Sequence, residues 1–171
     1  MYRIGEIVFH PLHGAGIIEG IESKKILNTT KQFYRIILPD SQLEEIYVPT
    51  SNANSLGLRY LIDKETIDEV KDILSEKLQL KIEEKWKDQF KKQEERVNSC
   101  DITKVAHALK FLFHKSLQKK LGSMDKWLLK KSKNIIASEI HFVESIDYAQ
   151  ALDMIDGWVK VSVVDVDKKI A

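Results

Sequence analysis

Apolar and polar residues follow a strand-like pattern in the first part of the chain and a helical period after about residue 60. Four short β-rich runs, separated by turn residues, precede that point: 6–9, 15–21, 33–38 and 44–48. Runs of this length that are rich in Ile, Val, Phe and Tyr are typical of strands. Because no helix lies between them, they predict a small, strongly bent sheet or SH3/Tudor-like barrel rather than a parallel α/β sheet.

Beyond Ile62 the apolar residues recur at three- and four-residue spacing, which predicts a bundle of about five helices. The apolar positions of the five segments are Ile67, Val70 and Leu74; Ile82, Trp86 and Phe90; Ile102, Val105, Leu109, Leu112 and Phe113; Met124, Leu128, Ile135 and Ile136; and Ala149, Leu152 and Ile155.

Residues with helix-capping side chains stand near the ends of these segments. Thr66 and Ser145 are placed to cap the first and fifth helices, Asp101 directly precedes the third, and Gly122-Ser123 separates the third from the fourth. From Val159 to Asp167 valine alternates with polar residues over much of the length, which favours a strand, although the sequence offers no evident partner for it.

The distribution of glycine and proline supports a boundary near residue 60. Five of the seven glycines and all three prolines precede it, and Lys, Glu, Leu and Ile dominate the rest of the chain. We therefore predict an α+β protein with a small amino-terminal β domain at residues 1–60 and a helical domain at 61–171, whose tail from about residue 159 is unassigned. A chain of 171 residues with 43% hydrophobic residues can bury a core in each domain.

The sequence carries no sign of export or of membrane insertion. Cys100 is the single cysteine and cannot form an internal disulfide, and residues 1–6 are not followed by the apolar run of a signal peptide. No apolar segment approaches the roughly 18 residues that a membrane span needs. We expect a soluble, cytoplasmic protein without a membrane partner.

Motifs of enzymes and cofactor sites are also missing. The run from Gly14 to Gly20 is one residue too long for the dinucleotide fingerprint, and no GxxxxGK[ST] phosphate loop occurs. His10 and His13, like His107 and His114, lack the accompanying Cys or carboxylate cluster of a metal site. Because Cys100 also has no evident base, we expect no enzyme and no cofactor.

Positive charge is concentrated in one stretch, although the formal net charge of the chain is only +1. Residues 85–133 hold fourteen Lys/Arg against five Asp/Glu, whereas 62–84 and 134–171 each carry four more acidic than basic residues. Trp86 stands at the amino-terminal edge of the basic stretch. A basic helical surface with a large aromatic side chain indicates contact with a polyanion.

The amino-terminal residues resemble a known family pattern. Gly5-Glu6-Ile7-Val8-Phe9-His10-Pro11-Leu12-His13-Gly14-Ala15-Gly16, followed by Tyr34, Val48-Pro49 and Gly57-Leu58-Arg59, is similar to the RNA-polymerase-interacting domain of the CarD/CdnL family of bacterial transcription regulators. The helical part resembles the family in Trp86-x3-Phe90-Lys91, in Asp101-Ile102-x-Lys104-Val105-Ala106 and from Leu121 to Glu139. Without a phosphate loop, the chain differs from transcription-repair coupling factor, a translocase with a similar polymerase-binding domain.

The resemblance implies a protein that contacts RNA polymerase and promoter DNA together. The β domain would bind the polymerase β subunit, and the helical domain would stabilise the open complex at the upstream edge of the bubble without reading its sequence. The strand at 43–48 would add to a polymerase sheet edge, and the predicted polymerase-binding residues are Lys24, Glu45, Ile46 and Tyr47. Tyr47 stands where the resemblance leads one to expect an arginine. The alternative is an ordinary exposed edge strand.

The resemblance gives Trp86 the role of the family tryptophan that inserts from the minor groove beside the first melted base pairs. The predicted DNA-binding residues are Trp86, Lys85, Lys87, Phe90, Lys91, Lys92, Lys126 and Lys130. Asp88 stands where the family usually has a basic residue, and it would either weaken this contact or form a helical ion pair with Lys91 or Lys92. Spacing alone instead favours a core position for Trp86, and lysines on exposed helix faces are commonly only solubilising.

The sequence supports two functional hypotheses. The first is a polymerase-bound transcription regulator that contacts DNA, and the second is a protein-interaction adaptor whose helical domain binds an acidic protein. We expect a monomer because both predicted surfaces serve other partners, although the predicted strand at 159–167 could pair with a second copy.

Overall fold

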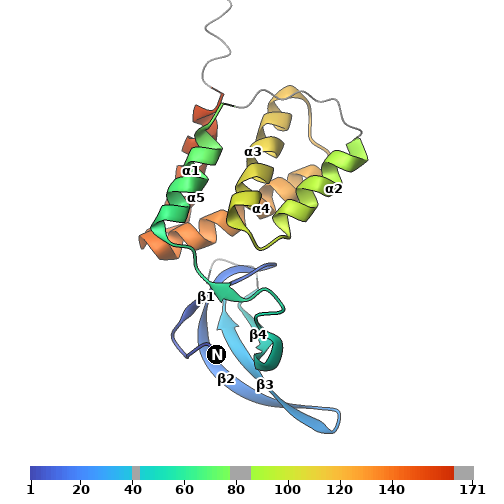
Figure 1. Ribbon diagram of the computed structural model, residues 1–171, viewed down its shortest axis with the longest axis vertical. Coiled ribbons are helices and arrows are strands. Elements are labelled where there is room, and N and C mark those ends of the chain that lie inside the picture. The colour runs from blue at the N-terminus through green and yellow to red at the C-terminus, as the bar shows by residue number, and fades with distance from the viewer. Residues whose placement is uncertain (40–42, 78–85, 164–171) are drawn as a thin grey trace, which may run out of the picture. The chain divides into compact units, whose positions relative to one another are not determined.

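The structure is a computed structural model that describes residues 1–39, 43–77 and 86–163, with the backbone alone at residues 86–88. The chain divides into two compact units, Met1–Leu61 and Ile62–Ala171. Figure 1 shows strands in the first unit and helices in the second. We consider each unit by itself.

The amino-terminal unit is an antiparallel five-stranded sheet of order β4-β3-β2-β1-β5. A single 3-10 turn, η1 (Thr50–Asn52), follows β4. The bent sheet predicted from the sequence is confirmed, but the short strand β5 was missed, and the long β2–β3 hairpin seen in Figure 1 extends well beyond the predicted strands. The strands are β1 (Ile7–His10), β2 (Gly14–Ile26), β3 (Thr29–Ile37), β4 (Glu45–Pro49) and β5 (Arg59–Tyr60).

The core of this unit follows the two-residue period of its strands. Tyr34 and Ile36 of β3 are buried, as are Val8 of β1, Ile18 of β2 and Val48 of β4. A bulge between Ile18 and Gly20 shifts the register of β2 against β3. Such bulges increase the local twist of a strand and allow a small sheet to bend around its core.

The carboxy-terminal unit contains five helices in its described residues, in agreement with the predicted bundle. Helix α3 packs against α1, α2 and α4, and α5 packs against α1 and α4. Its largest fully buried apolar side chains are Leu74, Leu112, Leu128, Ile136, Ile140 and Ile155. The helices are α1 (Lys64–Ser75), α2 (Trp86–Val97), α3 (Ile102–Gln118), α4 (Ser123–Glu144) and α5 (Tyr148–Val161).

Both predicted helix caps, Thr66 and Ser145, are wrong. The carboxylate of Asp101, which directly precedes the third predicted helix, accepts hydrogen bonds from the amides of Thr103 and Lys104 and caps α3. At α1, however, the cap is Asp63, whose carboxylate accepts the Thr66 amide hydrogen at 2.8 Å. Ser145 ends α4 in a left-handed conformation, and Asp147 caps α5 through a capping box with Gln150. Several polar residues near each boundary can cap a helix, and the packed backbone selects among them.

The sequence left the tail from residue 159 unassigned, although its pattern favours a strand, and the described part of this tail begins as helix. Residues up to Val161 form the last turn of α5, and residues 164–167 lie outside the described part of the chain. Val159 is buried and continues the four-residue spacing of Ala151 and Ile155. Burial of this stripe against α1 and α4 overrides the β propensity of the valines.

Two glycines of β2 give a matched test of how closely the sheet is packed. A Cβ atom at Gly16 would lie 2.6 Å from the carbonyl oxygen of Ile37, whereas one at Gly20 would meet nothing within 4 Å. We expect Gly16→Ala to lower the free energy of unfolding by about 2 kcal/mol or more, because backbone must move, and Gly20→Ala to leave it unchanged or slightly higher. Urea unfolding of both variants measures this, and equal stabilities would contradict the close packing.

Candidate functional site

Strand β4 lies at one edge of the described sheet and has a sheet neighbour, β3, on one side only. Just before the strand, the amide of Leu38 donates to the carbonyl oxygen of Glu44 at 3.0 Å. In an antiparallel ladder the paired and unpaired residues alternate, so Ile46 bonds to β3 while the backbone groups of Glu45 and Tyr47 point away from it. We call this outward side of residues 45–47 the β4 edge.

Three of the four predicted polymerase-binding side chains come together beside the β4 edge. The Lys24 ammonium lies 2.9 Å from the centroid of the Tyr47 ring, and the Tyr47 hydroxyl donates to Glu45 at 3.0 Å. Partial desolvation and then this hydrogen bond raise the pKa of Tyr47 above its usual value. Ile46, by contrast, packs against the core cluster of the sheet. Its predicted contribution is therefore limited to its backbone position.

Arg35 organises the remaining charges on this face of the sheet. Its guanidinium pairs with Glu19 and also with Glu22 at 3.6 Å and Glu45 at 3.5 Å. All four side chains are partly exposed, so each pair contributes little to stability. Their effect is to hold the Glu45 carboxylate and hence the Tyr47 hydroxyl in place.

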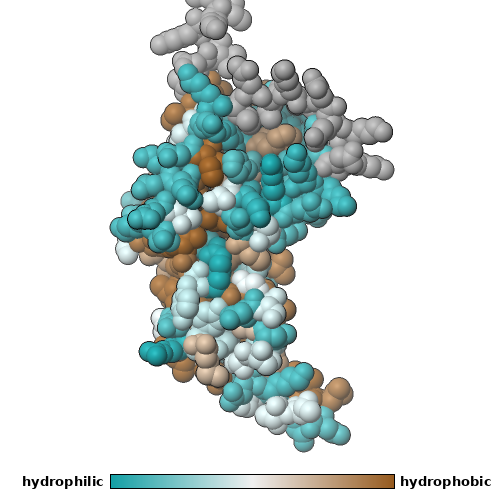
Figure 2. All heavy atoms as spheres, viewed as in Figure 1, coloured by the Kyte–Doolittle hydropathy of each residue, from teal (hydrophilic) through white to brown (hydrophobic). Residues whose placement is uncertain are grey.

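Helix α2 carries most of the predicted DNA-binding residues. Lys85 lies outside the described residues, and Trp86 and Lys87 open the helix with only their backbone described. The described inward face consists of Gln89, Gln93 and Val97, all buried. The predicted residues Lys91 and Lys92 are exposed, and Phe90 is partly buried. In Figure 2 hydrophilic side chains cover the side of α2 that faces the viewer.

The basic stretch at 85–133 does not form one continuous charged surface. The ammonium groups of Lys110 and Lys115 are buried and pair with Glu76 at 3.4 Å and Asp125 at 2.7 Å. Lys133 pairs with Asp156 at 2.6 Å. Some of the local surplus of positive charge is therefore neutralised within the fold, because helical spacing turns these lysines inward or toward a neighbouring helix.

The predicted residues Lys126 and Lys130 are exposed on consecutive turns of α4. The sequence left the position of Trp127 open, and the structure leaves its side chain 51% exposed. The ammonium of Lys131 lies 5.2 Å from the centroid of the Trp127 ring and donates to Asn98 at 2.8 Å. Burial lowers the pKa of Lys131, and Glu94 opposes this shift.

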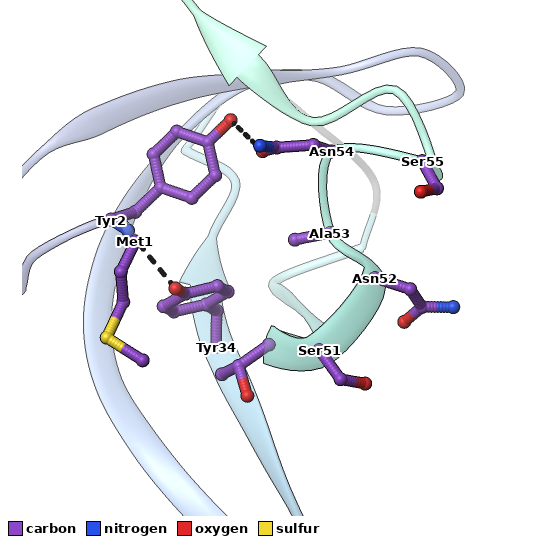
Figure 3. A pocket seen from close by; sticks show the side chains of 9 residues that line it. Met1, Tyr2, Tyr34, Ser51, Asn52, Ala53, Asn54 and Ser55 are labelled. Atoms are coloured by element: carbon purple, nitrogen blue, oxygen red, sulfur yellow. Dashed lines mark hydrogen bonds between the residues drawn. The ribbon is translucent and has the colours of Figure 1, made fainter.

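A pocket of about 280 Å³ lies in the amino-terminal unit and is lined mainly by the polar residues of the segment 50–55 (Figure 3). The Tyr2 amide donates to the Tyr34 hydroxyl at 3.1 Å, and the Tyr2 hydroxyl lies 2.8 Å from Asn54 Oδ1. These contacts connect the loop to the sheet.

Two histidines lie close together at the β1–β2 turn. His10 and His13 stack with their ring centroids 4.9 Å apart, and burial followed by the neighbouring His13 lowers the pKa of His10 to about 4. Among the described residues no group of three or more His, Cys, Asp or Glu side chains could hold a metal ion. The same residues include no helix that is long and apolar enough to cross a membrane.

Two family models match the chain. The model for the CarD-like/TRCF RID domain matches residues 2–62, and the model for the CarD C-terminal domain matches residues 69–156. The chain belongs to the CarD family. Its sheet is the Tudor-like RID domain, a class of domain that interacts with RNA polymerase, and the family comprises transcription regulators rather than known enzymes. The chain is thus associated with transcription regulation.

A curated relative covers nearly the same length. The chain is 27% identical over 154 residues to the "Putative transcription factor YdeB" of Bacillus subtilis (strain 168), and the matched region spans 88% of this chain and 97% of the relative. The similarity therefore includes both the β unit and the helical unit.

The Lys115–Asp125 ion pair gives a prediction about stability. Both side chains are at most 3% exposed, and removal of the cation leaves a buried carboxylate without its partner. We expect Lys115→Ala to lower the free energy of unfolding by about 3–5 kcal/mol. The control Lys126→Ala, on the exposed side of the neighbouring helix, is expected to change it by less than about 0.5 kcal/mol. Urea unfolding at pH 7 measures both, and a small loss for Lys115→Ala would show that the pair is not confined in the interior.

Proposed function

We propose that this protein binds the β subunit of RNA polymerase through the β4 edge and stabilises the promoter open complex through DNA contacts of its helical unit at the upstream edge of the bubble. The single observation that carries the proposal is the exposed β4 edge within an RID domain. Its outward backbone groups can pair with a strand of the polymerase, as in other cases of strand addition.

The side chains beside the β4 edge add a cation to this pairing. Tyr47 occupies the position where the family pattern leads one to expect an arginine, and the ammonium of Lys24 lies over its ring. A cation on an aromatic face remains available to an acidic partner group. Lys24 and Tyr47 together therefore supply a positive charge at the place where the arginine would otherwise supply one.

The DNA contacts are assigned to two helices of the second unit. Lys91 and Lys92 are exposed on α2, and Lys126 and Lys130 are exposed on α4. Ammonium groups bind phosphates without reading base sequence, so the contact is salt-dependent and is not specific to one promoter sequence. Trp86, the first residue of α2, is proposed as the wedge beside the melted base pairs.

An adaptor without DNA contact is the alternative, and it would use the same exposed lysines to bind an acidic protein. In the proposed function the chain acts in the cytoplasm. It acts as a monomer, because one unit binds polymerase and the other binds DNA. Polymerase binding and DNA contact are separated by variants of the β4 edge and of Trp86.

Replacement of an outward-pointing amide tests the β4 edge. We expect Tyr47→Pro to bind polymerase about tenfold more weakly than Tyr47→Ala, because both lack the ring but only proline lacks the outward N–H group. Surface plasmon resonance with purified polymerase measures the two affinities. A folded Tyr47→Pro protein that binds as tightly as Tyr47→Ala would exclude backbone pairing at this edge.

Ile46→Pro serves as a control for the same interaction. The Ile46 amide faces β3 in the ladder, so this variant is expected to lose stability and to melt at a lower temperature than Tyr47→Pro. The reverse order of melting temperatures would show that the assignment of inward and outward amides is incorrect.

The wedge role of Trp86 is tested on the lifetime of the open complex. If the indole occupies a partly unstacked base step, Trp86→Ala is expected to shorten the lifetime by about tenfold at constant salt, and Trp86→Phe by less. Urea unfolding of the same proteins separates this effect from a core role, in which the alanine variant would lose stability. An unchanged lifetime of the open complex with a folded Trp86→Ala protein would contradict the wedge hypothesis.

A further inference from the structure

Helix α3 and the first part of α4 hold very few acidic residues. Across residues 102–138 the only acidic residue is Asp125. Its carboxylate is 3% exposed and bonds to Lys115 at 2.7 Å in the interior. Asp125, the acidic residue closest in sequence to the exposed lysines of α4, is therefore buried and paired and does not offset their charge at the surface.

The lysines around the α3–α4 turn are exposed. They are Lys119, Lys120, Lys126 and Lys130. Like charges are concentrated here at the cost of mutual repulsion, which an anionic partner relieves. Charge complementarity therefore indicates a polyanion as the occupant of this surface.

Two large apolar side chains lie among these lysines. Met124 and Trp127, three residues apart on α4, are each 51% exposed. Residues at this spacing are neighbours on a helix surface. We call Met124, Lys126, Trp127 and Lys130 the α4 patch.

The size of the apolar part distinguishes between two kinds of anionic partner. An acidic amphipathic helix requires apolar anchors over about two turns, at i, i+3, i+4 and i+7. The apolar part of the α4 patch spans one turn and has two side chains, and the other exposed large apolar side chain described near this turn, Leu117, belongs to the end of α3. One indole with a neighbouring thioether suits a single unpaired base, and positively charged surfaces that bind single strands use aromatic side chains in this way.

We propose that Trp127 adds a base contact to the phosphate contacts assigned above to Lys126 and Lys130: the indole stacks on an unpaired base, and the two lysines hold phosphates on either side of it. The inference rests on the proposed function in that DNA is the partner, but its new element, Trp127, is separate from Trp86 and from the β4 edge. The neighbouring Lys131 orients the indole, since its ammonium lies near the ring and is anchored to Asn98 at the end of α2.

The test compares labelled DNA fork and duplex probes of equal length by fluorescence anisotropy with the full chain. Trp127→Ala is expected to weaken binding to the fork by about tenfold and to the duplex by less than about twofold, because stacking needs an unpaired base. Trp127→Phe keeps a ring and is expected to retain most of the affinity. Thermal melting confirms that both variants are folded.

Salt titration separates the aromatic contact from the phosphate contacts. Lys126→Ala is expected to reduce the slope of log affinity against log salt concentration, whereas Trp127→Ala leaves the slope unchanged because it removes no charge. Equal affinities of Trp127→Ala and the unaltered protein for the fork would overturn the proposal. So would an equal loss on fork and duplex, or a loss confined to a poly-glutamate probe, which would indicate an acidic protein partner.

The outcome is distinguishable from a failure of the proposed function. If Trp86→Ala leaves the lifetime of the open complex unchanged while Trp127→Ala weakens fork binding, the wedge role of Trp86 is wrong and the proposed base contact of Trp127 is supported. If the lifetime depends on Trp86 while fork binding does not depend on Trp127, the proposed function stands and the α4 patch is wrong.

Discussion

The Lys115–Asp125 ion pair connects the end of α3 to the start of α4 and has consequences for both the interior and the surface of the helical unit. Neither charge can be removed alone without leaving the other buried and uncompensated. The cation lies in the last turn of one helix and the carboxylate in the first turn of the next, where each interacts favourably with the helix dipole. The same pair withdraws the only acid of residues 102–138 from the surface that carries Lys126 and Trp127.

In the β unit the antiparallel register determines both which side chains are buried and which backbone groups are left outside the ladder. Alternation along β4 assigns Ile46 to the core and Glu45 and Tyr47 to the outer face, and the same alternation decides which backbone amides remain outside the ladder. Side-chain contacts and backbone pairing are thus fixed by one geometric constraint. A shift of one residue would exchange core and surface along the whole strand.

Much of the fold could be predicted because it depends on local patterns. The strand runs and the helical spacing of the apolar residues identified the main elements. Strand β5 was missed because a pair of residues carries too little periodicity to detect. The sequence left residues 159–167 unassigned because strand propensity and helical spacing coincide at Val159 and Val161. Burial of Val159 shows that this position belongs to α5.

The candidate surfaces depend more strongly on tertiary structure. The sequence by itself determined the residue types, the excess of lysine in residues 85–133 and the family pattern of the first sixteen residues. Only the packed helices decided that Lys110 and Lys115 are buried with acidic partners and that Trp127 is exposed. The physical reason is that burial and charge pairing join residues from different elements: Lys110 meets Glu76 across 34 positions of the chain, a separation that no local pattern encodes.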